Sequence, residues 1–149
     1  MPPSVLTRVR RICLALQGAH EKEAWGEPTW RVCNKVFAMF ASASNHHGAG
    51  QNSVWVNSTQ INQEFMMRAD PKRFFSPPYA GPYGWVGIRL DGRVNWKMVA
   101  EVLGDGYELT VAKLRPSQKA TLGMEPRLES AKPGKARNRT ARRGAVRRT

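Results

Sequence analysis

Residues 84–96, GWVGIRLDGRVNW, constrain the fold of this chain more than any other stretch, because they combine a strand, a tight turn and a helix start. Apolar side chains alternate with other types over residues 86–90, which is the two-residue period of a half-buried strand. The Asp-Gly pair that follows tolerates the backbone of a tight turn, and Asn95 can cap a helix. Apolar residues then recur at the i, i+3, i+4 and i+7 spacing of an amphipathic helix. A strand therefore passes into a helix within about four residues.

Charge is distributed unevenly along the chain. Residues 1–109 contain 12 Lys and Arg against 9 Asp and Glu, a net of +3, whereas residues 110–149 contain 12 against 2, a net of +10. All five tryptophans precede residue 97, in a stretch long enough for a single core, which usually takes roughly 100–150 residues. We therefore expect one α/β domain over residues 1–116 and a basic, disordered tail over residues 117–149.

Such a positive field attracts polyanions, with nucleic acid first and anionic membranes or acidic proteins behind it. The chain has no apolar run of the roughly 18 residues that a membrane span needs, and residues 1–16 carry charges unlike a signal peptide, so we expect a cytoplasmic protein. Cys13 and Cys33 lack a CxxC partner, which indicates neither a disulfide framework nor a zinc site. The pair His46-His47 has no Cys or carboxylate nearby, so we expect no metal and no other cofactor.

The first half of the chain predicts a helix and a hairpin. Ser4 can cap a helix with an apolar face, which Gly18 ends. Residues 29–33 and 36–41 are predicted as two strands around a turn at Asn34-Lys35. The second strand, VFAMFA, is apolar on both faces, which is typical of a central strand covered on both sides.

Further elements are expected on either side of the 84–96 stretch. Residues 53–57 predict another strand, and Thr59 can cap a short helix whose apolar side carries Ile61 and Phe65. The Gly-Asp-Gly sequence at residues 104–106 predicts that the last long helix breaks there, with one more short helix before Pro116.

Aromatic residues, proline and glycine crowd the stretch PKRFFSPPYAGPYGW, residues 71–85. One interpretation is a platform where Arg73, Phe74, Tyr79 and Tyr83 meet phosphates and bases. The alternative is that these aromatic side chains close the end of the core.

No motif in the sequence indicates catalysis. P-loop, GxGxxG, HExxH, GxSxG and CxxC patterns are absent. Glu27, Asp91 and Asp105 lie near turns, but each has an ordinary turn or capping role, and none is paired in sequence with a second titratable group. We therefore expect a protein that is not an enzyme, and the sequence identifies no small-molecule substrate.

Three stretches are similar, in order and spacing, to the MmcQ/YjbR family of small bacterial proteins: residues 25–40 (WGEPTWRVCNKVFAMF), 77–96 (PPYAGPYGWVGIRLDGRVNW) and 106–114 (GYELTVAKL). The resemblance implies an α+β fold, in which helices pack an antiparallel sheet, related in shape to the frataxin-like CyaY fold. It also implies DNA binding, and it brings no catalytic residues. The family-motif positions are Trp25, Gly26, Glu27, Pro28, Thr29, Trp30, Trp85 and Trp96, together with Arg31, Lys35 and Arg89.

These observations lead to the hypothesis of a DNA-binding protein that holds double-stranded DNA mainly by its phosphates. On the domain, the candidate phosphate contacts are Arg31, Lys35, Lys72, Arg73 and Arg89. In the tail, they are Arg137, Arg139, Arg142, Arg143, Arg147 and Arg148. Two alternatives stay open: a module that binds a protein or ligand through its tryptophans and the proline-aromatic loop, and a factor associated with RNA or the ribosome.

Overall fold

The computed structural model describes residues 3–44 and 50–123 and divides the chain into two units, residues 1–113 and 114–149. In the second unit it describes a short helix, α4 (Pro116–Thr121), at the start of the segment that the sequence predicts as a tail. His46-His47 and the candidate arginines from Arg137 to Arg148 lie outside the described residues. The fold below is that of the first unit.

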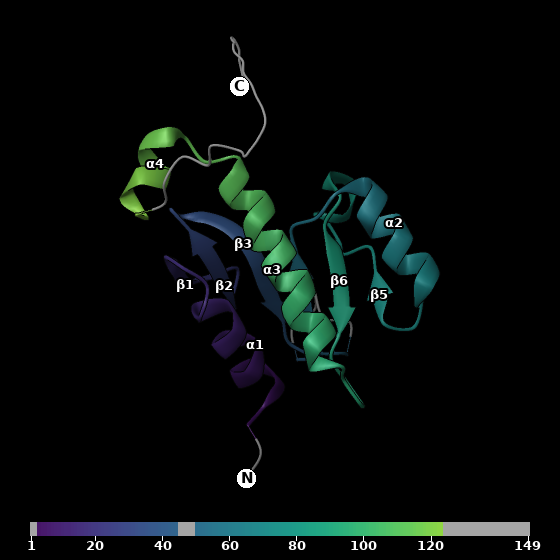
Figure 1. The fold of residues 1–149 in the computed structure, drawn as a ribbon. Coiled ribbons are helices and arrows are strands. Elements are labelled where there is room, and N and C mark those ends of the chain that lie inside the picture. The colour runs from purple at the N-terminus through teal and green to yellow at the C-terminus, as the bar shows by residue number, and fades with distance from the viewer. Residues whose placement is uncertain (1–2, 45–49, 124–149) are drawn as a thin grey trace. The chain divides into compact units, whose positions relative to one another are not determined.

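The first unit is an antiparallel sheet with strand order β1-β2-β3-β4-β6-β5 and helices beside it (Figure 1). Figure 1 shows α1 and α3 against one face of the sheet, whereas α2 lies beside β5. This is the α+β architecture that the sequence predicts. In chain order the elements are α1 (Val5–Leu14), β1 (Ala19–Ala24), β2 (Glu27–Val32), β3 (Lys35–Ala41), β4 (Ser53–Val56), α2 (Gln60–Ala69), β5 (Phe74–Phe75), the 3-10 helix η2 (Gly81–Tyr83), β6 (Val86–Arg89) and α3 (Trp96–Ala112).

Two-residue hairpin loops join the first three strands. Trp25 and Gly26 connect β1 to β2 with φ of 56° and 77°, and Cys33 and Asn34 connect β2 to β3 with φ of 48° and 63°. Positive φ at both positions is the type I′ geometry, whose twist matches that of the paired strands. The predicted turn at Asn34-Lys35 is therefore wrong by one residue, because Lys35 already begins β3.

Strand β1 is not predicted by the sequence analysis. Its residues are mostly polar and exposed, because it is the edge strand of the sheet and pairs with β2 alone. Without an apolar face, residues 19–24 give no two-residue hydrophobic period.

The main core lies between the helices and one face of the sheet, and a smaller cluster of Met39, Ala41 and Trp55 lies on the other face. In the main core, Val56 of β4, Ile88 of β6 and Leu103 of α3 are fully buried. The rings of Phe37 and Tyr107 meet edge to face, with centroids 5.6 Å apart and an angle of 84° between their planes. The side chain of Asn95 accepts a hydrogen bond from the backbone of Met98 and caps α3, as the sequence predicts.

The break predicted at residues 104–106 is wrong, because α3 continues through it to Ala112. A β-carbon at Gly106 would lie 2.5 Å from a methyl group of Val56 and 2.8 Å from the carbonyl oxygen of Asn57. Glycine is therefore needed here for the close approach of α3 to β4, and helical backbone tolerates it at a cost of about 1 kcal/mol relative to alanine.

Helix α2 begins at the predicted cap, Thr59, but its burial is reversed from the prediction. Ile61 and Phe65 are exposed, whereas Gln63 is buried. The amide of Gln63 donates hydrogen bonds to the carbonyls of Gly81 at 3.0 Å and Trp85 at 2.5 Å. The inward side of α2 therefore holds a loop by polar contacts instead of packing on the apolar core.

Candidate functional site

Strand alternation sorts the charges of β1 between the two faces of the sheet. Glu21 accepts hydrogen bonds from the guanidinium of Arg10 in α1 at 2.7 and 3.0 Å and from the indole of Trp30 at 3.0 Å, so it lies on the helix-covered face. Successive side chains of a strand point to opposite faces. Lys22 therefore points to the side that neither α1 nor α3 covers, which we call the open face.

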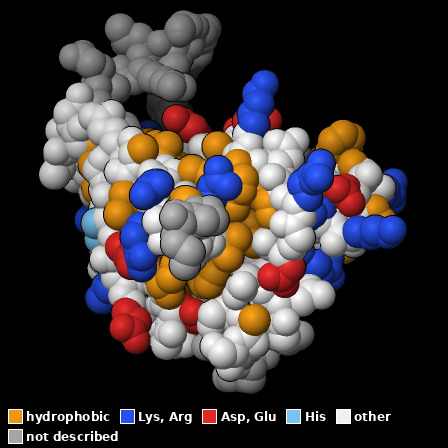
Figure 2. All heavy atoms as spheres, turned by 90° about the horizontal axis from the view of Figure 1, so that it is seen from below, with side chains coloured by type: hydrophobic (Ala, Val, Ile, Leu, Met, Phe, Trp, Pro, Cys, Tyr) orange, Lys and Arg blue, Asp and Glu red, His pale blue; other side chains and the backbone are white. Residues whose placement is uncertain are grey.

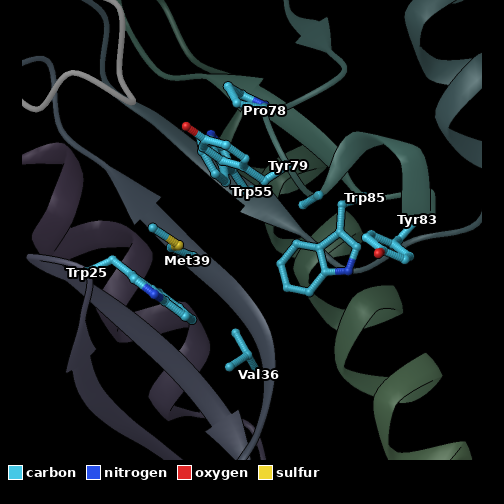
Figure 3. Close-up of a pocket in the computed structure, with 9 residues that line it drawn as sticks. Trp25, Val36, Met39, Trp55, Pro78, Tyr79, Tyr83 and Trp85 are labelled. Carbon is cyan, nitrogen blue, oxygen red and sulfur yellow. The ribbon is translucent and has the colours of Figure 1, made fainter.

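A pocket of about 560 Å³ with a mostly apolar lining lies on the open face (Figure 3). Met39 of β3 and Trp55 of β4 are cross-strand partners and form its floor. Figure 3 shows Trp25, from the first hairpin loop, at one side of the pocket and Trp85, just before β6, at the other. The remaining lining residues are Val36, Pro78, Tyr79, Ala80 and Tyr83.

Aromatic side chains at the rim of this pocket are exposed. The exposed fractions are 66% for Trp25, 75% for Tyr79 and 80% for Tyr83. Trp25 and Tyr79 also have positive φ, 56° and 66°, a conformation that bulky side chains rarely adopt and that costs on the order of 1–3 kcal/mol. Two exposed aromatic residues with positive φ at one pocket make it a candidate site, because unusual backbone conformations cluster at functional sites.

Polar contacts from α2 hold the loop that forms one side of the pocket. Besides the bonds of Gln63, the amide of Gln60 donates to the carbonyl of Pro82 at 2.5 Å. Gly84 has φ of +93°, and a β-carbon there would lie 2.9 Å from the backbone nitrogen of Gln60. Only glycine fits this close approach, so the position of Tyr83 and Trp85 is fixed by backbone geometry.

On the β6 side of the open face, an arginine lies over an aromatic ring. Gly87 has no side chain, and a β-carbon at this position would lie 2.3 Å from the ring of Phe75. The ring therefore packs directly on the backbone of β6. The guanidinium carbon of Arg89 lies 4.7 Å from the centre of the same ring, a cation–π contact.

Two candidate phosphate contacts bind backbone carbonyls. The guanidinium of Arg73 donates to the carbonyls of Arg89 at 2.6 Å, Arg93 at 2.8 Å and Asp91 at 3.2 Å. That of Arg89 donates to the carbonyls of Lys72 at 3.2 Å and Pro71 at 3.3 Å. Both side chains therefore tie the segment before β5 to the end of β6.

The other domain candidates differ in position. Arg31 donates to the hydroxyl of Thr29 at 3.1 Å, which places it on the open face, since Thr29 pairs with Met39 of the pocket floor. Lys35 and Lys72 are exposed. The structure thus brings Arg31 and Arg89 to the open face, whereas Lys35 lies opposite Val32, which points to the same helix-covered face as Trp30.

The family-motif residues divide between the pocket and the framework. Trp25 and Trp85 line the pocket, whereas Trp30 is fully buried on the helix side. The carboxylate of Glu27 is 3% exposed and accepts hydrogen bonds from the backbone nitrogen of Ser42 at 2.8 Å and its hydroxyl at 3.0 Å. The motif from Trp25 to Trp30 therefore mainly stabilises the hairpin, and Trp25 is its exposed tryptophan.

Trp96, another of the family-motif residues, lies at the start of α3 and does not line the pocket. The guanidinium carbon of Arg8 in α1 lies 4.8 Å from the centre of its ring. This cation–π contact joins α1 to α3.

The pKa values of Glu21 and Cys13 are shifted, and the structure gives the cause of each shift. The hydrogen bond from Arg10, followed by that from Trp30, lowers the pKa of Glu21 against an opposing effect of burial. Burial raises the pKa of the Cys13 thiol far above its ordinary value.

Among the described residues, no group of three or more His, Cys, Asp and Glu is placed to hold a metal ion. In the same residues no helix has the length and apolar character to cross a bilayer.

Comparison with known proteins gives a family match and a solved structure of similar fold. The YjbR family profile matches residues 14–109, about two thirds of the sequence. The chain belongs to the YjbR family. A solved structure of similar fold is that of Deinococcus radiodurans protein DR2400, described as having a DUF419 domain, with a TM-score of 0.69 and 17% sequence identity. The match covers 84% of this chain and 92% of that one. No curated protein matches.

The predicted family and the α+β fold with an antiparallel sheet are thus confirmed, while the likeness to CyaY stays a prediction. Of the proposed aromatic platform, Tyr79 and Tyr83 reach the pocket rim, but Phe74 is buried opposite Ile88. The sequence patterns do not predict that Met39 and Trp55 line the same pocket as these tyrosines. Cross-strand pairing brings them together, and no local pattern in the sequence reports it.

Proposed function

We propose that this YjbR-family protein binds nucleic acid, with double-stranded DNA as the first expectation, mainly through the phosphate backbone. The observation that carries the proposal is the charge distribution, with a net of +10 over residues 110–149 against +3 over the rest. Flexible Lys and Arg side chains contact phosphates without reading base edges, so the binding should be largely independent of sequence. DNA binding is also what the resemblance to the MmcQ/YjbR family implies.

Cationic side chains on the domain support the same proposal. Lys35 and Lys72 are exposed and can contact phosphates directly. Figure 2 shows one side of the molecule on which Lys and Arg side chains, with Asp and Glu side chains among them, lie around a group of apolar side chains. We call residues 110–149 the basic segment. A polyanion attracted by the basic segment would meet further positive charge on the domain.

A mobility-shift titration with duplex DNA tests this function. The full chain is compared with a chain that lacks residues 116–149 and with a full-length variant in which Arg137, Arg139, Arg142, Arg143, Arg147 and Arg148 are all Gln. We expect both to bind at least about tenfold more weakly, because each phosphate contact removed reduces the release of counterions. Unchanged binding by both would refute the role of the basic segment.

Substitutions on the domain separate its contribution from that of the basic segment. Lys35→Glu and Lys72→Glu should each weaken binding of the full chain, whereas Lys97→Glu, at an exposed position of α3, makes the same change of net charge and is the control. Competition between DNA and RNA of matched length then decides whether RNA is the preferred polyanion.

A second candidate function, a module that binds a protein or small ligand, is supported by the pocket on the open face. Its volume of about 560 Å³ lies in the range of roughly 300–1,000 Å³ typical of ligand sites. Exposed aromatic side chains favour a partner, whereas buried ones favour a role in the core. Trp25, Tyr79 and Tyr83 are exposed and line the pocket, so they support a partner, while the buried Trp30 belongs to the core.

A further inference from the structure

We propose that the pocket on the open face is a stacking site for unpaired bases, so that this chain binds single-stranded nucleic acid by its bases and duplex by its phosphates alone. This inference rests on the proposed nucleic-acid function and adds a substrate class to it. It commits the pocket to one occupant, a single strand of DNA or RNA.

The pocket offers flat aromatic surfaces at its rim, where a base could stack. Trp25 and Tyr83 are mostly exposed and come from opposite sides of the pocket, the first hairpin loop and η2. Stacking on aromatic side chains tolerates any base, because every base has a π-face. In a duplex the bases are already stacked and paired, so the pocket selects unpaired ones.

Charge complementarity identifies the occupant as anionic. Among the described strand residues that point to the open face, Lys22, Arg31 and Arg89 are cationic. The acid on this face, Glu27, is buried and bonded to Ser42. An aromatic pocket alone would also suit an organic cation, but cations at its flanks disfavour that ligand.

The spacing of these cations suits a chain of phosphates better than a single anion. Lys22 lies on β1 and Arg89 on β6, four strand spacings apart, or about 19 Å at about 4.8 Å per strand. The pocket floor, Met39 of β3 and Trp55 of β4, lies on strands between them. A single strand that crosses the sheet can therefore place phosphates on the flanking cations and bases on the rings, as is usual for domains that bind single strands on a sheet.

The backbone of Trp25 provides a test that separates binding from folding. Trp25 occupies the first position of a type I′ turn before Gly26, where asparagine is strongly preferred. Trp25→Asn therefore removes the ring and relieves the turn, so the variant should melt at the temperature of the wild type or above it. A loss of binding in this variant cannot then be attributed to a damaged fold.

The experiment measures binding of the full chain to three probes by fluorescence anisotropy: a single strand of about 12 nucleotides, a strand of the same length with abasic sites throughout, and a duplex. We expect Trp25→Asn and Tyr83→Ala each to weaken binding of the normal strand about 5-fold or more, and to leave duplex binding within about twofold. The control, Phe65→Ala, removes an exposed ring of α2 outside the pocket and should change neither.

The abasic strand distinguishes base stacking in the pocket from binding of the phosphates. Wild type should bind it at least as weakly as each single pocket variant binds the normal strand, because the abasic strand keeps the phosphates and lacks every base that could stack. If normal and abasic strands bind equally, or if the pocket variants bind the normal strand like wild type, the stacking site is refuted while phosphate binding stands. If no probe binds even at low salt, the proposed function itself fails.

Discussion

At the scale of the residue, the ionised side chain of Glu21 supports the fold. It joins α1, β1 and β2 through its bonds to Arg10 and Trp30, and the bond from Arg10 is the main cause of its lowered pKa. A carboxyl group with a lower pKa in the folded state stabilises the protein above its ordinary pKa, about 4.3 for glutamate. That stability is lost as the pH falls through the folded-state pKa.

Glu21→Gln should therefore flatten the fall in unfolding free energy on acidification below about pH 4.5. At pH 7 the loss should be modest, because the ion pair is partly exposed to solvent. Urea unfolding from pH 7 to pH 3, followed by tryptophan fluorescence, measures both effects, and Glu101→Gln at an exposed position of α3 is the control. An acid dependence equal to that of wild type would contradict this role for Glu21.

The two cysteines should differ in reactivity. Cys13 is fully buried in α1 and burial raises the pKa of its thiol, so it has neither access to solvent nor thiolate character. Cys33 is half-buried in the second hairpin loop. A thiol reagent should therefore label one cysteine in the native protein, Cys33, and both in denaturant, as peptide mapping by mass spectrometry can verify. Rapid native labelling of Cys13 would mean that α1 detaches from the sheet.

At the scale of the element, α3 contains two glycines with opposite expected roles. Gly104→Ala should stabilise the protein by about 0.5–1 kcal/mol, because a β-carbon there meets nothing within 4 Å and alanine favours the helix. Gly106→Ala gains the same propensity but forces a contact with Val56 and Asn57, and should destabilise by about 1–3 kcal/mol. Chemical denaturation of the two variants provides the comparison, and equal effects would contradict the close approach of α3 to β4.

Sequence patterns predict elements where one face is apolar and the ends carry caps. Ser4, Thr59 and Asn95 each cap the helix that the sequence assigns to them. The patterns fail where a contact distant in sequence decides the outcome. Gly106 does not break α3, because it fits against β4, and Gln63 points inward to bind a loop about 20 residues later.

At the scale of the whole molecule, the charge distribution predicts a steep dependence of binding on salt. If six of the arginines beyond residue 130 touch phosphates, the slope of log affinity against log salt is about −5, and the affinity for duplex falls roughly a thousandfold between 50 and 200 mM. In the variant with those six arginines replaced by glutamine, the slope should be smaller in magnitude by about 5. Duplex titrations at four salt concentrations measure the slope, and a slope near zero would exclude phosphate contacts as the source of affinity.

Family and fold class were predictable because the motif from Trp25 to Phe40 and the strand-turn-helix of residues 84–96 are local. The pocket was not, because its floor is made by pairing Met39 with Trp55, and its rim by loops whose backbone is held from α2. The exposed aromatic residues could be suspected from composition alone. Their convergence on one face depends on the order of the strands.

The alternation of charge along β1 has a consequence for how the molecule behaves in a crowded solution. β1 is the longer of the two outermost strands, six residues against two in β5. An outermost strand invites a strand from another copy to add to it. Here any such neighbour would have to lie beside Glu21 and Glu23 on one side and Lys22 on the other, so the same charges that separate the two faces also protect the protein from aggregation.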